Sequence, residues 1–399
     1  MDNPKKIMLF ALILTMLGQG TFTLYIPSLP TLSHDLHSSP TQIKLTLTIF
    51  LLAYGISQIF YGPISDVIGR KKPLIFGIAL IIIGSAWAIF TKDLLTFNLS
   101  RILQGIGAGA TMVLIRAALI DSLSVPDQAK GTSYLSIGFA LGLGIFPVIG
   151  GALTHWFNWR AEFIFLTIIN IIILIGIIFY LPETLNKNKN KKTLLQHGEL
   201  ALKQYFQVIT NKIFWLFLLG GMSAYSVVIA YNAMTPFLFQ KTIGMSAQDY
   251  GIISIVIAIP YWLGAYLNKR LVKKIGPKFF MLVGAVVIII SGTLLIILKL
   301  SVTNINLYIV LIPLCFAVFG QALVWSNAMA KALQNFPEFA GIASALFGCG
   351  QFTISALVAA ILALPKESNQ MPISITILVL GILSGIITID AFKIKKKSI

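Results

Sequence analysis

The chain has 399 residues, of which 57% are hydrophobic and 11% are charged, and its formal net charge is +17. Soluble domains carry about 25% charged residues, so this composition excludes an ordinary soluble domain and indicates an integral membrane protein. The cations recur in alternate loops instead of forming one basic surface, which argues against nucleic acid as a partner. Cys315 and Cys349 lie in apolar runs, as small core residues do, and predict neither a disulfide nor a metal site.

Twelve apolar runs are long enough for helices that cross roughly 30 Å of hydrocarbon. They are residues 7–25, 43–60, 74–90, 94–119, 133–153, 161–181, 213–237, 250–267, 279–298, 305–329, 342–364 and 373–392. Lys5 and Lys6 precede the first run as they would in a secretory signal, but no small-residue cleavage site follows. The sequence therefore predicts an all-α membrane protein with twelve transmembrane helices.

The distribution of cations predicts the orientation. With both termini placed in the cytoplasm, 22 of the 30 lysines and arginines fall in inner segments, 6 in outer segments and 2 inside a helix. Short loops rich in Lys and Arg resist translocation, so we expect both termini to be cytoplasmic.

A polar stretch divides the twelve runs into six and six. Residues 183–212 carry many lysines and predict a cytoplasmic linker between an N-terminal six-helix bundle, residues 1–182, and a C-terminal bundle, residues 213–399, with a basic cytoplasmic tail. Transporters built from two such halves place their substrate site between the repeats.

A charged segment, residues 62–74, joins the second and third runs and is expected to be a cytoplasmic turn, because it holds Arg70, Lys71 and Lys72 together with Asp66. Opposite charges gathered at one membrane face predict either a latch that opens as helices rearrange or a static ion-pair cluster, and the sequence favours neither. The residues assigned to this latch are Gly62, Asp66, Gly69, Arg70, Arg116 and Asp121.

Arg101 is the deepest charge within a predicted span, about 10 Å below the outer surface on the helical rise. We expect it to line a cavity, with snorkelling to the surface as the alternative. Several neutral polar and aromatic residues also lie within spans, where each could contact a ligand or bond to another helix. The residues assigned to the cavity are Thr23, Tyr25, Arg101, Gln104, Tyr231, Asn232, Trp325 and Gln351.

Small residues and prolines predict close helix packing or a hinge in the fourth and fifth spans. The residues assigned to this role are Gly105, Gly109, Gly142, Pro147, Gly150 and Gly151. A dinucleotide fingerprint is excluded at the fourth-span glycines, because no strand precedes them. No span holds a carboxylate near its centre, and no metal set, nucleophile triad or phosphate loop is visible, so we expect neither an enzyme nor a cofactor.

These motifs resemble those of a known family. Residues 62–74 look like the signature loop of the major facilitator superfamily, and residues 101–105 with the glycines after them look like its fourth-helix motif. The run with Pro147, Gly150 and Gly151 is similar to the antiporter motif of its drug exporters.

A narrower resemblance is to the bicyclomycin/chloramphenicol-resistance (Bcr/CflA) branch. It is carried by residues 25–30, by Arg116 with Asp121, and by a set just before and within the eleventh span. That set is Pro337, Ala340, Gly341, Ala343, Ser344, Ala345, Leu346, Gly348 and Gln351.

The resemblance implies a twelve-helix, two-bundle drug:proton antiporter of a bacterial inner membrane, which exports small amphipathic compounds by alternating access and works as a monomer in the lipid bilayer. It implies that Asp66 caps the eleventh helix near Gly341 and that Arg70 pairs with Asp121, which together hold the outward-facing state. The chain departs from the family pattern at Thr23, where an acid is usual, at Val67 and at Phe146. The alternatives are a carrier of one metabolite such as a siderophore and, from another class, a membrane-embedded enzyme or a channel.

Overall fold

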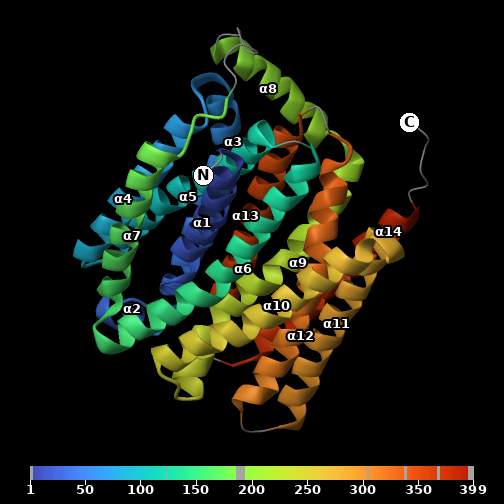
Figure 1. Ribbon diagram of the computed structural model, residues 1–399. Coiled ribbons are helices and arrows are strands. Elements are labelled where there is room, and N and C mark those ends of the chain that lie inside the picture. The colour runs from blue at the N-terminus through green and yellow to red at the C-terminus, as the bar shows by residue number, and fades with distance from the viewer. Residues whose placement is uncertain are drawn as a thin grey trace.

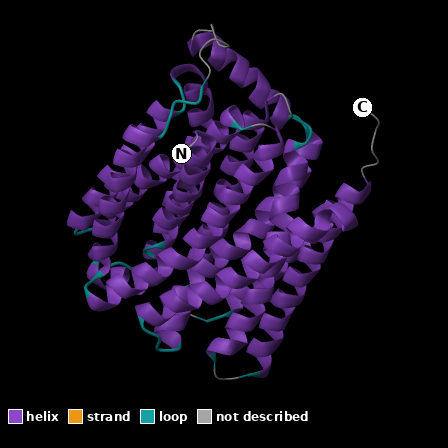
Figure 2. Cartoon of the chain, viewed as in Figure 1, coloured by secondary structure: helices purple, strands orange, loops and turns teal. Residues whose placement is uncertain are grey.

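The computed structural model describes residues 3–123, 125–185, 194–302, 305–336, 339–365 and 369–393, and within these ranges it is helical with no strand (Figures 1 and 2). The helices are α1 (Asn3–Thr23), η1 (Ile26–Ser28), α2 (Leu29–Asp35), α3 (Pro40–Ile68), α4 (Lys71–Phe90), α5 (Leu94–Ser122), α6 (Val125–Trp156), α7 (Trp159–Tyr180), α8 (Leu194–Ile209), α9 (Lys212–Phe237), η3 (Leu238–Thr242), α10 (Ala247–Ile275), α11 (Pro277–Ser301), α12 (Leu307–Leu333), α13 (Ala340–Ala363) and α14 (Met371–Lys393).

The described residues contain 12 helices that are long and apolar enough to cross a membrane, which confirms the predicted spans. Several are longer than their apolar runs, because the polar residues next to a run continue the same helix. α3 begins at Pro40 behind a capping box formed by Ser39 and Gln42, and it extends through Pro63 to Ile68.

The expected turn at residues 62–74 is therefore mostly helix, and this prediction was wrong in extent. The chain reverses at Gly69, whose φ of 98° favours a residue without a Cβ, and α4 begins two residues later at Lys71. The second half has the same kind of chain reversal at a glycine with positive φ: Gly276, with φ 95°, lies between α10 and α11. This likeness in backbone supports an internal repeat.

The helices form two packed groups. α1 and α3–α7 pack mainly on one another, and α9–α14 do the same, while the groups meet chiefly where α3 lies against α13 and α6 lies against α10 (Figure 1). The domain boundaries at residues 182 and 213 stay a prediction.

The linker contains a helix that was not predicted. α8 lies across one end of the molecule (Figure 1), which we call the α8 end; the opposite end, beside α2, is the α2 end. Ala201 and Tyr205, one turn apart, pack near Ile342 of α13, and Tyr205 Oη donates a hydrogen bond to Ile59 O at 2.7 Å. α8 thus bridges the two groups, although its overall composition is that of a polar linker.

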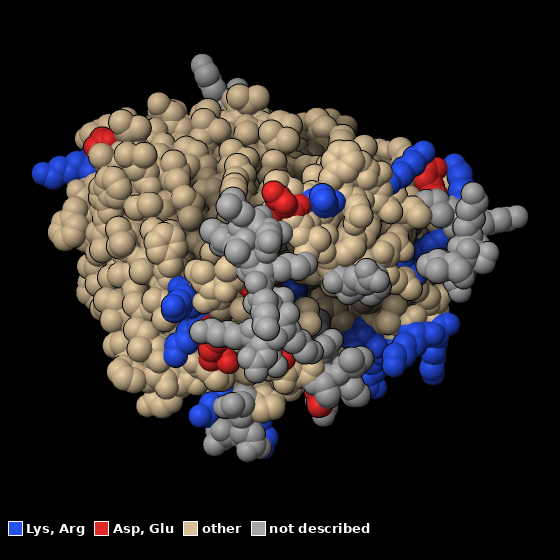
Figure 3. Space-filling model, turned by 90° about the horizontal axis from the view of Figure 1, so that it is seen from above, with Lys and Arg blue, Asp and Glu red and all other residues tan. Residues whose placement is uncertain are grey.

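Lysine and arginine side chains stand around the face at the α8 end, which Figure 3 views directly. Lys72 at the start of α4 and Lys269 with Arg270 near the end of α10 are exposed there.

The two groups are closed against each other at the α2 end. Lys44 Nζ of α3 donates to Leu362 O of α13 at 3.4 Å, so this lysine, counted above with an outer loop, is buried in a helix. Gln240 Nε2 of η3 donates to Pro27 O of η1 at 2.7 Å. We call these contacts the α2-end seam.

Candidate functional site

Arg101 lies inside the N-terminal group of helices and is 0% exposed, so it does not snorkel to the membrane surface. Its guanidinium carbon lies 4.0 Å from the ring centre of Tyr25 and 4.3 Å from that of Phe50, and Nη1 donates to Gln104 Oε1. Gln104 Nε2 donates in turn to Ser85 Oγ of α4 at 3.0 Å. Aromatic faces and one amide therefore hold the cation.

Close helix packing brings Phe50 to this cation. A Cβ on Gly105 would lie 2.6 Å from the backbone oxygen of Phe50, so α5 and α3 approach each other at a position where only glycine fits. A Cβ on Gly109 would lie 2.0 Å from Ser57 Oγ, a side-chain atom that would have to move. Both glycines, four residues apart, thus lie at the contact between α5 and α3.

Arg101 has no carboxylate in ion-pair contact in the described part of the chain. Two of its nitrogens, Nε and Nη2, are buried without a hydrogen-bond partner there. A buried donor without an acceptor is costly, so this site has bonding capacity that the closed structure does not use.

Glu162 is a buried acid that the sequence analysis did not select. It is 0% exposed, Oε2 lies 3.0 Å from Ser28 Oγ, and Thr154 Oγ1 donates to Oε1 at 2.5 Å. The residue lies in the first turn of α7 and at the second position of the sixth predicted run, residues 161–181. The available signal was an acid inside the start of an apolar run of spanning length.

The α1–α6 contact uses two predicted residues. Thr23 Oγ1 lies 3.1 Å from Gln19 O and 3.0 Å from Gly142 O, so its single hydroxyl hydrogen has one acceptor within α1 and one on α6. A Cβ on Gly142 would lie 2.8 Å from Gln19 Cβ, which explains the small residue.

The later part of α6 packs against both groups. A Cβ on Gly150 would lie 1.8 Å from Leu24 O, and one on Gly151 would lie 2.4 Å from Ala247 O of α10. Pro147 lies within α6, and its carbonyl oxygen is 2.5 Å from where a Cβ on Gly251 would be. This stretch is a close inter-helix seam, one of the two roles predicted for it.

An aromatic cluster joins the two groups near the middle of the molecule. Phe139 of α6 stacks on Trp325 of α12 with ring centres 5.9 Å apart, and lies 5.3 Å from Tyr261 of α10. Trp325 Nε1 donates to Gln351 Oε1 of α13 at 2.8 Å, while Tyr225 of α9 packs against Trp325 at 6.2 Å.

A second contact extends the cluster across the groups: the rings of Tyr54 (α3) and Phe352 (α13) stack at 4.0 Å. Phe139, Tyr54 and Phe352 were not predicted, because an aromatic residue in an apolar run gives no sign of which helix it faces.

The other predicted cavity residues lie elsewhere. Tyr231 Oη is 3.5 Å from Ser254 Oγ and its ring stacks on Tyr250, while Asn232 is nearly buried. The eight predicted residues thus form separate groups in this closed structure, and a single open cavity is not what they line.

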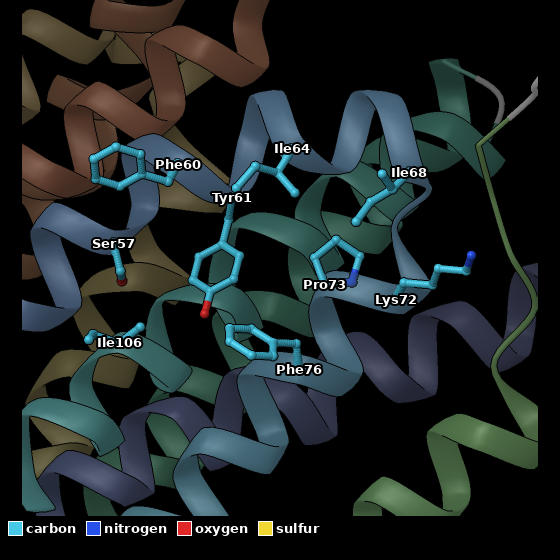
Figure 4. Close-up of a pocket in the computed structure, with 9 residues that line it drawn as sticks. All are labelled: Ser57, Phe60, Tyr61, Ile64, Ile68, Lys72, Pro73, Phe76 and Ile106. Atoms are coloured by element: carbon cyan, nitrogen blue, oxygen red, sulfur yellow. The ribbon is translucent and has the colours of Figure 1, made fainter. Parts of the chain in front are cut away.

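A groove of about 450 Å³ lies between α3, α4 and α5 (Figure 4). Phe60 and Phe76 border the groove and are largely exposed, so the groove opens on the surface of the helix bundle and not into its interior. Lys72 lies at one end of the groove. None of the described residues predicted for the cavity lines it.

The predicted charge cluster forms at the α8 end. Arg70 Nε donates to Asp121 Oδ2 at 2.8 Å and Arg70 Nη1 donates to Asp66 Oδ1 at 2.5 Å. Burial lowers the pKa of Arg70, but hydrogen bonds and charge from Asp121 and Asp66 outweigh it and hold the pKa above its usual value. Both acids and Arg70 belong to the N-terminal group of helices.

Glu183, just after α7, was not predicted and completes this cluster. Its carboxylate accepts the backbone N–H groups of Arg70 at 2.8 Å and Lys71 at 3.2 Å. Burial raises the pKa of Glu183, but the bonds from backbone N–H groups outweigh it and hold the pKa below its usual value. A Cβ on Gly69 would lie 2.3 Å from Glu183 Oε2, a second reason for glycine there, whereas a Cβ on Gly62 would meet open space.

Two residues assigned to this region make contacts other than those of a single charge cluster. Arg116 pairs with no acid in the described ranges; its Nη1 donates to Ser344 Oγ of α13, which makes it a contact between the groups. Among the described residues Asp66 bonds to Arg70, and no bond joins it to Gly341. Pro337 lies outside the described residues.

The chain is 26% identical over 385 residues to a bicyclomycin resistance protein homolog of Haemophilus influenzae, covering 94% of each. It is 26% identical over 378 residues to multidrug resistance protein D of Escherichia coli, covering 95% of this chain and 93% of that protein.

The fold is similar to that in the crystal structure of a D-xylose-proton symporter, with a TM-score of 0.77 and 17% identity over 98% of each chain. The model of the Major Facilitator Superfamily matches residues 8–360. The chain therefore belongs to the Major Facilitator Superfamily.

Proposed function

We propose that this transporter exports small amphipathic compounds, drugs among them, by alternating access and in exchange for protons. The observation that carries the proposal is the aromatic cluster that both groups of helices build. Phe139 and Trp325 meet there from opposite groups, and the hydrogen bond from Trp325 to Gln351 supplies a polar contact. Flat apolar rings with few polar groups suit cargo that is itself partly apolar. Two relatives named for drug resistance support this cargo class.

The closed α2-end seam fits one end state of such a cycle. Gln240 with Pro27 and Lys44 with Leu362 hold the groups together there, and cargo reaching the aromatic cluster from that side must separate them. The cations at the α8 end support a cytoplasmic position for that end and for both termini. On this account the α2 end faces outward, and the protein works as a monomer in a bacterial inner membrane.

Export is tested by the accumulation of a lipophilic dye in cells with and without the protein. We expect cells that contain it to retain less dye, because the carrier removes the dye against its gradient. A protonophore should abolish the difference. Equal retention across a broad panel of compounds, with no protonophore effect, would contradict the proposal.

Arg101→Ala should abolish export while the protein still reaches the membrane. Losing the cation should slow transport by roughly tenfold or more, since each ~1.4 kcal/mol lost from a rate-limiting step costs tenfold. Arg101→Lys should restore little, because a compact ammonium group cannot replace the planar guanidinium that contacts both the Tyr25 and Phe50 rings and Gln104. Export assays normalised to protein amount measure this, and normal export by the alanine variant would leave Arg101 a purely structural residue.

Asp66→Asn should slow turnover while cargo affinity stays unchanged, since we propose that the charge cluster at the α8 end works as a latch. The matched control is Asp390→Asn, which removes an exposed ion pair with Lys393 and should have no effect. Transport rates and cargo binding are compared for both variants. A lower melting temperature with normal turnover would show that the charge cluster is a static ion-pair cluster that only stabilises the fold. This alternative to a latch fits a cluster that is confined to one group of helices.

A further inference from the structure

We propose that Glu162 is the site at which the exchanged proton binds. We further propose that Ser28 transmits a change in the protonation of Glu162 to the contacts of the α2-end seam. The inference rests on the proposed proton exchange and names the group that carries it. It also supplies the acid that the family pattern places at the position of Thr23. Glu162, on α7, lies at the same end of the N-terminal group of helices.

The first argument is burial. Glu162 is 0% exposed and has no ion-pair partner within the described residues, while hydroxyls of Ser28 and Thr154 contact its two oxygens. An ionised carboxylate in such a place is expensive, and a protonated one is far less so. The closed structure therefore suits the neutral acid.

The second argument is a count of hydrogens. Ser28 Oγ lies 2.8 Å from Tyr25 O and 3.0 Å from Glu162 Oε2, yet one hydroxyl carries a single hydrogen. When Ser28 donates to the carbonyl of Tyr25, the bond to Glu162 must use a proton on the carboxyl group. The neutral acid and Ser28 then both have partners. Because Tyr25 O also accepts the backbone N–H of Ser28 at 3.1 Å, Ser28 can instead donate its hydroxyl hydrogen to an ionised Glu162, so the direction of this bond follows the protonation state of the acid.

The third argument is the charge that acts on Glu162. Arg101 of α5 attracts it electrostatically, and the ring of Tyr25 covers Arg101 at 4.0 Å. Arg160, on the same helix as Glu162, is engaged by Asp35 of α2 at 4.0 Å. On α6, His155 is exposed.

Loss of the proton then gives a second arrangement. The O–H bond of the carboxyl group breaks, the proton passes to water, and the electron pair stays on Glu162. The new carboxylate attracts Arg101, whose Nε and Nη2 have no hydrogen-bond partner among the described residues, and it competes with Tyr25 O for the hydrogen of Ser28. Both changes disturb the backbone around Tyr25 and Ser28.

η1 connects this change to the other half of the molecule. Ser28 ends η1, and Pro27 in the same turn accepts the bond from Gln240 of η3 at 2.7 Å. A shift of Ser28 by the ionised acid therefore loosens the α2-end seam. Protonation holds the seam closed and deprotonation favours opening, so opening should increase as pH rises.

The experiment measures the seam without cargo. Spin labels are placed at His34→Cys in α2 and Lys241→Cys in η3, both exposed, after Cys315 and Cys349 are replaced by serine. Pulsed electron paramagnetic resonance spectroscopy gives the distance between the two spin labels across a pH series in lipid nanodiscs. We expect a short distance at low pH and a growing longer population as pH rises.

Glu162→Gln keeps the shape of the side chain but cannot ionise, so its labels should stay at the short distance at every pH. Glu162→Asp should keep the response with a shifted midpoint, and Ser28→Ala should weaken it while the acid remains. Glu199→Gln, an exposed glutamate on α8, is the matched control and should respond as the parent does. Infrared difference spectra should show a carboxylic acid band that titrates with the distance and is missing in Glu162→Gln.

An unchanged pH response in Glu162→Gln, or no response in the parent, would overturn the inference. Neither readout needs cargo. A parent that responds to pH through Glu162 yet exports nothing would contradict the proposed function and leave the proton site standing, so the two failures are distinguishable.

Discussion

The rest of the structure depends on one constraint: Arg101 carries a charge inside a bundle surrounded by hydrocarbon and must be stabilised entirely by protein groups. Tyr25, Phe50 and Gln104 do so, and their positions require α1, α3 and α5 to approach closely. The glycines of α5 permit that approach. A charge held by rings and an amide, with two nitrogens unused, is stable enough to persist and able to take a new partner.

The same end of the molecule joins this interior to the contact between halves. The ring of Tyr25 covers Arg101. Within the next three residues, Pro27 O accepts a hydrogen bond from Gln240, and Ser28 contacts Glu162. Four residues of chain therefore link a buried cation, a buried acid and the α2-end seam. A local change in charge can be converted there into movement of one half against the other.

The sequence predicts the fold well, because twelve apolar runs of spanning length and the glycine at position 105 reflect local constraints of the bilayer and of helix packing. It predicts Arg70 with Asp121 through resemblance and Arg101 through its depth. It does not predict α8, whose few apolar residues matter only once Ile342 is beside them, and it misses Glu162, whose burial depends on helices distant in sequence. The grouping of the polar residues likewise depends on rotations that periodicity does not fix.

The central claim is that the two halves separate at the α2 end during transport. It is tested most directly by Pro27→Cys with Gln240→Cys in a protein without other cysteines, joined by a short reversible thiol cross-linker and assayed in liposomes. The account predicts that cross-linked protein transports nothing and that reduction restores transport. Full transport by protein shown to be cross-linked would contradict it.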